Sequence, residues 1–334
     1  MLLSHHLLSA ASVPSLLDAV RALPGKMPGS RFVFKRFFLS HPRQRDLFPK
    51  EPGAVAYIVQ PPLQPGVAVA AWVVLATDAD VHGENDCSIV TDGALQWIWT
   101  SGVTAPGASS EVQTDGILAR YEAFLAGRGL NLPENCVRTW FFCHDIDHLY
   151  AGLVKARRER FERLGLTAQT HYIASTGIQG DPPVQDAVVQ MDALALQGPF
   201  SQRYLYAPTH LNPTHEYGVT FERGVRVEAG GSAYTLISGT ASIDNKGAVL
   251  HVGDIAAQTR RMMENVDVLL SESGACDCDL QQILVYLRRS DDYALVDTLF
   301  AERYPHTPYL ILHAPVCRPD WLIEMECIAQ QPLR

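Results

Sequence analysis

The chain has 334 residues, of which 47% are hydrophobic, 19% charged and 9% aromatic. This composition excludes disordered, collagen-like and coiled-coil proteins, and the length favours about two domains that each bury a core. The 27 Lys and Arg residues are outnumbered by 36 Asp and Glu residues, and the resulting net charge of -9 argues against a general nucleic-acid or anionic-membrane binder.

The N-terminal segment has some features of a secretion signal. However, no Lys or Arg precedes its apolar stretch, and Asp18 follows that stretch closely. We therefore expect residues 1–20 to belong to the mature protein, in the cytoplasm. The seven cysteines are an odd number and are widely spaced, which is unlike a disulfide framework, so we expect reduced thiols.

The chain contains an internal repeat, which begins near residue 95 and has a period far longer than that of solenoid repeats. Strand patterns at 95–102 and 233–239 open the two copies, and both contain the pair Ser-Gly. Amphipathic stretches at 112–130 and 254–274 then predict helices. The linker between the copies is expected where prolines and polar residues interrupt the periodicity, after residue 197.

The remaining elements of the two copies also correspond. After a β-rich run, acidic residues begin a second helix near Tyr150 in the first copy and near Tyr293 in the second. In the first copy the predicted strands are 137–142 before this second helix and 171–176 and 188–195 after it. In the second copy they are 283–288 before the helix and 309–314 and 322–329 after it. A strand or hairpin is also expected before each copy, at 54–76 and at 219–227. The pattern predicts an α+β fold in which two helices cover one face of a mixed sheet.

The second copy resembles the RidA/YjgF deaminase family. The segments that carry the resemblance are 237–242 (ISGTAS), 254–266, 285–287 (VYL) and 323–329 (IEMECIA). Members of this family form trimers with ligand sites between subunits. RidA deaminases hold an imino acid with an Arg near the start of the strand after the second helix. This chain has His306-Thr307-Pro308-Tyr309 there, so imine hydrolysis by that route is not expected.

Residues 30–330 as a whole resemble a narrower group, the bacterial chorismatases and 3-hydroxybenzoate synthases. The segments that carry this match are 170–177 (THYIASTG), 207–213 (APTHLNP), 217–224 (YGVTFERG) and 314–324 (APVCRPDWLIE). The resemblance implies two fused RidA/YjgF-like (chorismate-mutase-like) domains in a pseudo-trimer-like arrangement. These are a degenerate N-terminal domain at 1–197, a linker at 198–218 and a catalytic C-terminal domain at 219–334.

Glu324 is the leading catalytic candidate. Strand alternation places it on one face with Glu326, and the first copy has Gln190 at the equivalent position, so one functional site per chain is expected. The residues alone favour a solvated strand carboxylate. The resemblance favours proton transfer, because the matching Glu has that role in both families. An acid that works near pH 7 needs a raised pKa, which burial supplies.

Cys317 lies in a Pro-Val-Cys-Arg-Pro turn seven residues before Glu324. A free cysteine is more often a small buried hydrophobe than a reactive group. In the resembled group, however, a cysteine at this point accompanies the enzymes that form 3-hydroxybenzoate, so the resemblance implies a catalytic role and an aromatic product. Arg318 beside it is expected to lower the pKa of the thiol.

A dicarboxylate substrate requires Arg, together with Tyr or backbone donors. The resemblance assigns this role to Tyr150 and Arg157, at i and i+7 on one face of the first copy's second helix, although a solvated basic face remains an alternative for Arg157. From the linker and the strands beside it, the further substrate-binding candidates are Tyr206, Tyr217, Arg223 and Gly239. Gly239 would make room for the ligand, unless it is a simple turn glycine.

Two metal-like patterns have simpler interpretations. His144 and His148 have an i,i+4 spacing but fall at a helix entry, which favours a cap over a zinc site. Cys276 and Cys278 lack the two-residue gap of a zinc or redox motif. We expect no metal and no cofactor.

The resemblance implies a small-molecule dicarboxylate, chorismate, as substrate, with no nucleic acid or membrane as partner, and a monomer or low-order oligomer. Protonation of the enol ether of chorismate would release pyruvate and a hydroxybenzoate. That product is expected to be 3-hydroxybenzoate, with 4-hydroxybenzoate as a further product, for pigment biosynthesis and other aromatic secondary metabolism. Two alternatives stay open. One is a hydrolytic chorismatase that yields a dihydroxycyclohexadiene carboxylate, and the other is a non-catalytic RidA-like ligand-binding or regulatory protein.

Overall fold

A computed structural model describes residues 1–333, which form three sheets. The first sheet has the order β1-β4-β2-β3 and comprises β1 (Leu2–Ala10), β2 (Ser30–Leu39), β3 (Ala54–Val59) and β4 (Val69–Thr77). The helical segments of this part are α1 (Val13–Arg21), α2 (Leu23–Lys26) and the 3-10 helix η1 (Pro42–Leu47).

The second sheet has the order β5-β6-β7-β10-β8-β9. Its strands are β5 (Asp80–Glu84), β6 (Cys87–Asp92), β7 (Leu95–Val103), β8 (Cys136–Cys143), β9 (Ala174–Gln179) and β10 (Val189–Gln197). The third sheet has the order β11-β12-β13-β16-β14-β15. Its strands are β11 (Phe200–Leu205), β12 (Gly224–Ala229), β13 (Ser232–Ala241), β14 (Leu280–Leu287), β15 (Tyr309–His313) and β16 (Ile323–Pro332).

The long helices fall where the repeat predicts them. They are α3 (Ser110–Ala126) and α5 (Ile146–Arg163) in the second part, and α6 (Ile255–Ser273) and α7 (Tyr293–Arg303) in the third. The short helix α4 (Leu132–Asn135) was not predicted. Local sequence sets the ends of α6. The side chain of Asp254 accepts a hydrogen bond from the Ala257 amide at 3.0 Å, and Gly274 ends the helix with a φ of 84°.

The mixed α+β fold and the fused repeat are confirmed. In both copies the first long strand and the closing strand are antiparallel, and β8 and β14 each pair with the closing strand on one side and with a parallel edge strand on the other. A strand begins within the expected linker, because β11 pairs with β12 in the third sheet. The division into two domains with a linker at 198–218 stays a proposal.

Residues 1–77 differ from the expectation. Strands β3 and β4 do not form a hairpin that leads into the first copy. Instead, β4 is antiparallel to β1 and β2, and β3 is parallel to β2, which is the pairing of the repeat without its second long helix. The chain therefore contains a third, shorter unit. The sequence pattern hid it because β4 is an unbroken buried apolar run and α1 has only nine residues.

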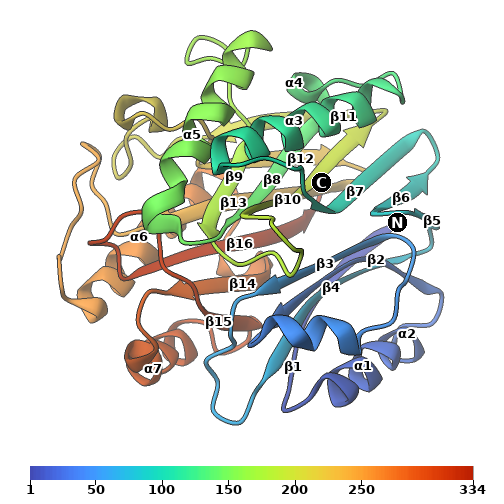
Figure 1. The fold of residues 1–334 in the computed structure, drawn as a ribbon, viewed down its shortest axis with the longest axis horizontal. Helices are drawn as coiled ribbons and strands as arrows, with labels where there is room; N and C mark the ends of the chain where they lie inside the picture. The colour runs from blue at the N-terminus through green and yellow to red at the C-terminus, as the bar shows by residue number, and fades with distance from the viewer. Residues whose placement is uncertain (334) are drawn as a thin grey trace.

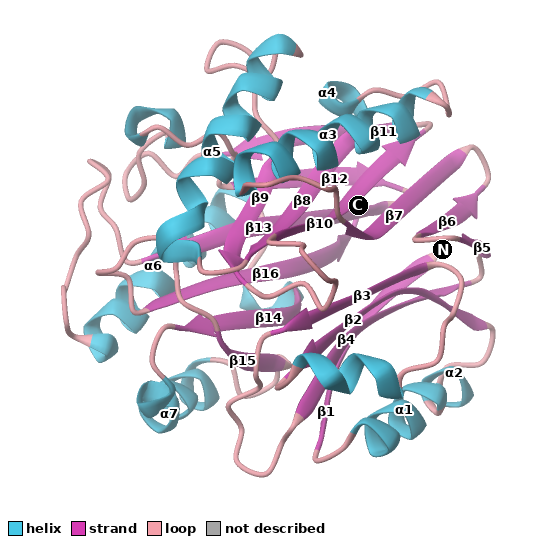
Figure 2. Cartoon of the chain, in the orientation of Figure 1, coloured by secondary structure: helices cyan, strands magenta, loops and turns pink. Residues whose placement is uncertain are grey.

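The three sheets lie at the centre and the helices lie on the outside (Figure 1), as the colouring by secondary structure also shows (Figure 2). Isolated bridges join the units in a cycle, at Val59 with Asp181, Ala174 with Glu222 and Pro62 with Leu312. In the shared core, the Trp72 ring lies 6.1 Å from that of Trp99 and 5.6 Å from that of Trp140. The pseudo-trimer is therefore complete within one chain.

Cys276 and Cys278 are joined by a disulfide, so the expectation of seven reduced thiols is wrong for this pair. The other five cysteines are free. Among residues 1–333, no helix combines the length and the hydropathy that a membrane span requires.

Candidate active site

A cavity of about 190 Å³ lies where the second and third units meet. Helix α5 and strand β9 line one side, and β13, β16 and the loops before β12 and β16 line the other. Seven of the eight predicted site residues line this cavity: Tyr150, Arg157, Tyr217, Arg223, Gly239, Cys317 and Glu324. The fold thus brings together side chains that lie up to 174 positions apart in the chain.

Tyr206 is not part of this group. Its side chain is 47% exposed, and its backbone amide donates to the carboxylate of Glu272 on α6. We therefore remove Tyr206 from the candidate site. The prediction rested on the adjacent segment 207–213, which carries part of the resemblance. In the structure Tyr206 directly follows β11 and lies on the surface.

Glu324 lies on β16 and is only 4% exposed. Among residues 1–333 no hydrogen bond reaches its carboxyl group, which borders the cavity. Burial and, to a smaller extent, the nearby Glu326 carboxylate together raise the pKa of Glu324 to about 8, against the opposing effect of Arg223 and Arg138. The Glu324 carboxyl is therefore protonated at neutral pH, as a general acid requires.

Gly239 lines the cavity and also lies against Glu324. A Cβ placed there would lie 2.2 Å from Glu324 Oε1 and 3.1 Å from the methyl group of Thr176. The missing side chain therefore makes room for the Glu324 carboxyl itself. Gly177 has a similar relation to Tyr150, whose ring would lie 3.1 Å from an added Cβ.

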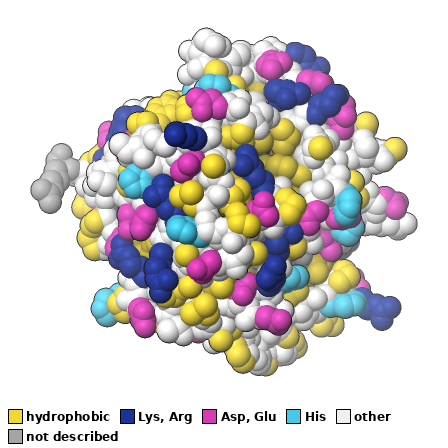
Figure 3. Space-filling view, turned by 90° about the vertical axis from the view of Figure 1, so that its left-hand side faces the viewer, with side chains coloured by type: hydrophobic (Ala, Val, Ile, Leu, Met, Phe, Trp, Pro, Cys, Tyr) yellow, Lys and Arg dark blue, Asp and Glu magenta, His cyan; other side chains and the backbone are white. Residues whose placement is uncertain are grey.

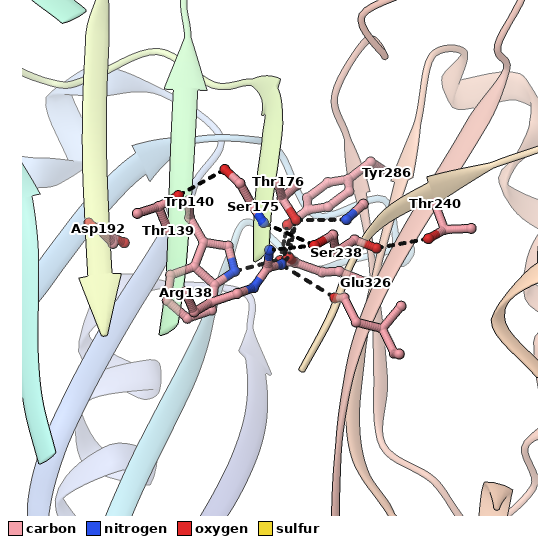
Figure 4. Close-up of polar contacts among 12 residues, drawn as sticks. Arg138, Thr139, Trp140, Ser175, Thr176, Asp192, Ser238, Thr240, Tyr286 and Glu326 are labelled. Carbon is pink, nitrogen blue, oxygen red and sulfur yellow. Dashed lines mark hydrogen bonds and ion pairs between the residues drawn. The ribbon is translucent and has the colours of Figure 1, made fainter. Parts of the chain in front are cut away.

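Glu326 lies behind the cavity lining and is hydrogen-bonded to Thr176, which lines the cavity. Its carboxylate is 2% exposed and accepts hydrogen bonds from Arg138, from Trp140 Nε1 at 2.9 Å, from Thr176 Oγ1 at 2.5 Å and from the Tyr286 hydroxyl at 2.7 Å. Figure 4 shows these donors converging on Glu326 from the second and third units. This buried ion pair between β8 and β16 links the two units directly beneath Glu324.

The cavity contains three guanidinium groups. Arg157 is 1% exposed, and its Nε and Nη2 have no hydrogen-bond partner within residues 1–333. Arg223 donates through Nη2 to the Asn212 carbonyl at 3.0 Å, while its Nε has no partner in the same range. Arg318, which the sequence analysis considered only as a neighbour of Cys317, lies 4.6 Å from the Tyr217 ring centre. Unpartnered buried donors of this kind favour an anionic ligand.

Cys317 is half-buried in the cavity wall. Arg318 does act to lower the pKa of its thiol, as does a hydrogen bond from Tyr150, but burial and the neighbouring Glu324 outweigh them and raise it to about 12. The predicted effect of Arg318 is therefore present, but the net shift of the pKa is upward. Cys317 borders the cavity as a neutral thiol.

The metal-like patterns have other partners. Nδ1 of His144 lies 2.9 Å from the Asp181 carboxylate, and Nδ1 of His148 lies 2.8 Å from that of Asp145. Asp145 precedes α5 but makes no capping hydrogen bond through its side chain, which differs from the expected cap. On the face shown in Figure 3, acidic and basic side chains are interspersed, so this face has no extended basic surface.

Comparison with known proteins links the third unit to one family and the whole chain to one fold. The family model described as endoribonuclease L-PSP matches residues 221–331. The 3-aminoacrylate deaminase RutC of Acinetobacter baylyi is 33% identical over 95 residues, which are 28% of this chain and 75% of that protein. A RutC family protein of Pyrococcus abyssi is 33% identical over 98 residues, which are 29% of this chain and 77% of that protein.

The crystal structure of a chorismatase matches along almost the whole length. It covers 98% of this chain and 99% of the other, with a TM-score of 0.73 and 16% sequence identity. This similarity shows a common fold for all three units, including the short first one. The RutC matches show that the chain belongs to the RutC (RidA/YjgF-like) family through its third unit, and the whole chain shares the fold of that chorismatase structure.

Proposed function

We propose that this protein is a chorismatase that converts chorismate to pyruvate and a hydroxybenzoate. The observation that carries the proposal is the buried, protonated carboxyl group of Glu324 in a cavity that also holds unpartnered guanidinium donors. The fold shared with a chorismatase supports it. An acid beside an anion-binding wall suits a dicarboxylate with a proton-accepting carbon, which is what chorismate offers.

The first step is protonation of the terminal methylene carbon of the enol ether by Glu324. It forms a C–H bond and leaves an oxocarbenium ion, whose positive charge lies beside the new Glu324 carboxylate. In the route to 3-hydroxybenzoate the neighbouring ring hydroxyl adds to the cation and loses its proton, which gives a cyclic ketal. The bond from this hydroxyl oxygen to the ring and the bond from the ketal carbon to the ether oxygen then break, so that pyruvate leaves with the former hydroxyl oxygen and the ether oxygen stays on the ring. In the hydrolytic route water adds instead, and collapse of the hemiketal releases pyruvate and a dihydroxycyclohexadiene carboxylate. Arg157 and Arg223 hold the two substrate carboxylates during these steps.

We propose 3-hydroxybenzoate as the main product. Pyruvate and 3-hydroxybenzoate together contain all the atoms of chorismate, so formation of this pair returns one proton to the enzyme for each proton donated. The Glu324 carboxylate left by the first step is available to take that proton from the ring. Cys317, as a neutral thiol in the wall, helps to exclude the water that would give a dihydroxycyclohexadiene carboxylate instead.

Incubation of the purified protein with chorismate tests the proposal. The ultraviolet absorbance of chorismate should fall and pyruvate should appear in equal amount, with 3-hydroxybenzoate identified by chromatography. Glu324→Gln should lower the rate of pyruvate release at least a thousandfold. Absence of turnover in the wild-type protein would favour a non-catalytic ligand-binding protein.

The product assignment has its own test. Cys317→Ala should increase the share of hydrolytic or 4-hydroxy product while pyruvate release continues. An unchanged product mixture would remove Cys317 from product control. The cytoplasmic location, the monomeric or low-order state and the link to pigment biosynthesis are parts of the same proposal.

A further inference from the structure

The polar network beneath Glu324 contains a buried carboxylate that the proposed proton transfer does not use directly. Glu326 and Glu324 are two residues apart on β16, so their side chains leave the same face of the strand. Glu326 accepts from four donors, whereas no hydrogen bond within residues 1–333 reaches Glu324. One carboxyl group is anchored and the other is available to a ligand.

Hydrogen bonds connect the Glu326 carboxylate through Thr176 to Gly239, whose backbone contacts the Glu324 carboxyl. Thr176 Oγ1 donates to Glu326 and in turn accepts from the Gly239 amide at 2.9 Å. The Gly239 backbone lies directly under the Glu324 carboxyl, because a Cβ there would lie 2.2 Å from Oε1. Movement of Glu326 would therefore displace Thr176 and Gly239, and with them the support of the acid.

The ion pair spans the seam between the units. Arg138 on β8 donates to Glu326, to Thr176 Oγ1 at 2.6 Å and to Ser238 Oγ at 3.2 Å. Ser238 Oγ also accepts from the Ser175 amide at 2.9 Å. Hydrogen bonds thus connect Glu326 to residues of both units, and Figure 4 shows these contacts around Arg138 and Thr176.

We propose that Glu326 is a positioning residue for the proton transfer: it fixes the floor under the Glu324 carboxyl, and its negative charge holds that carboxyl in the acid form. The inference rests on the proposed function, since it assigns Glu324 the role of acid. Like charges on one face disfavour double ionisation, and in a dry environment the effect is strong. The titratable or charged groups that act on Glu324 or lie beside it in this site are Glu326, Arg138, Arg223, Cys317, Tyr150 and Tyr286.

Glu326→Gln tests the role, because an amide can keep the hydrogen-bond geometry without the charge. Its oxygen can accept from Thr176 and Trp140, and its amino group can donate to the Tyr286 hydroxyl. Loss of the carboxylate also leaves Arg138 unpaired, and both changes favour ionised Glu324. The alkaline limb of the pH–kcat profile should therefore move down by at least one pH unit, a loss of about fivefold or more at pH 8.

A matched control exists in the neighbouring unit. Asp192 on β10 pairs with Arg36 at 2.8 Å, and both side chains are fully buried. Asp192→Asn should destabilise the protein about as much as Glu326→Gln and leave the alkaline limb in place. If Glu326→Gln does not fold, the double variant Arg138→Met/Glu326→Gln removes both buried charges. Its alkaline limb should still lie below that of the wild type, because the Glu326 charge acts on Glu324 more strongly than Arg138 does.

A direct titration separates this inference from the proposed activity. The carbon-13 resonance of the Glu324 carboxyl, assigned with Glu324→Gln, should titrate about one pH unit or more lower in Glu326→Gln than in the wild type. This readout needs no substrate, so it stands even if chorismate is not converted. An unchanged titration of Glu324 in folded Glu326→Gln, or an equal shift in Asp192→Asn, would overturn the positioning role.

Discussion

Replacement of Glu324 by Gln should make the protein more stable as well as inactive. In the folded state burial raises the pKa of Glu324 from 4.5 to about 8. The unfolded state releases this proton at lower pH, so between these two values the unfolded chain binds fewer protons and the free energy of unfolding falls as pH rises. A neutral Gln of similar shape removes this penalty.

The size of the effect follows from the two pKa values. The cost of a group that titrates at 4.5 when unfolded and near 8 when folded is about 1 kcal/mol at pH 5, about 3 kcal/mol at pH 7 and about 4 kcal/mol at pH 8. Glu324 is almost fully buried, so solvent screening reduces these figures little. The gain in stability of Glu324→Gln should therefore grow with pH.

Urea unfolding of both proteins at pH 5 and pH 8 measures the difference. The wild type should lose stability relative to the variant over this interval. The exposed Glu302→Gln on α7 serves as the control and should show no such trend. A gain that is the same at both pH values would show that Glu324 does not titrate between them, and the general-acid argument would fail.

Two further substitutions and one chemical modification test the cavity residues. Arg157→Met should raise the KM for chorismate about tenfold to a hundredfold, the value of a buried charge-assisted hydrogen bond, with a smaller change in kcat; steady-state kinetics checks this, and an unchanged KM would remove Arg157 from carboxylate binding. Gly239→Val should lower kcat at least a hundredfold without unfolding the chain, because its side chain occupies the place of the Glu324 carboxyl; wild-type activity would contradict the packing argument. Cys317 should react with iodoacetamide about ten times faster for each unit of pH up to 10, since the pKa of its thiol is raised to about 12; a plateau near neutral pH would show a thiolate instead.

Much of the fold follows from local sequence signals. The helix bounded by Asp254 and Gly274 was predictable because its cap residues and apolar spacing act over a few positions. The repeat was predictable because two copies retain the same order of such signals. The first unit was not, since β4 has no alternation and its acid position is occupied by Ala70, which faces Phe38 as Glu324 faces Tyr286.

Sequence reasoning identified most residues of the candidate site, but not their pKa values or their ion-pair partners. Family motifs and strand alternation pointed to Glu324, Cys317 and Arg157. The effect of Arg318 on Cys317 could not be judged from adjacency, because burial outweighs one neighbouring charge. The pairing of Arg138 with Glu326 joins residues 188 positions apart, and nothing in either local sequence indicates it.

Sequence by itself determined which segments of the two recognised copies become strands and helices, and that the second copy carries Glu324 where the first carries Gln190. Tertiary structure decided that Glu324 is buried, protonated and without a hydrogen bond from any of residues 1–333, and that Tyr206 lies elsewhere. The reason is physical. Helix caps and strand alternation depend on neighbours in the chain, whereas proton affinity depends on the solvent and charges that the packing of separate units removes or brings near.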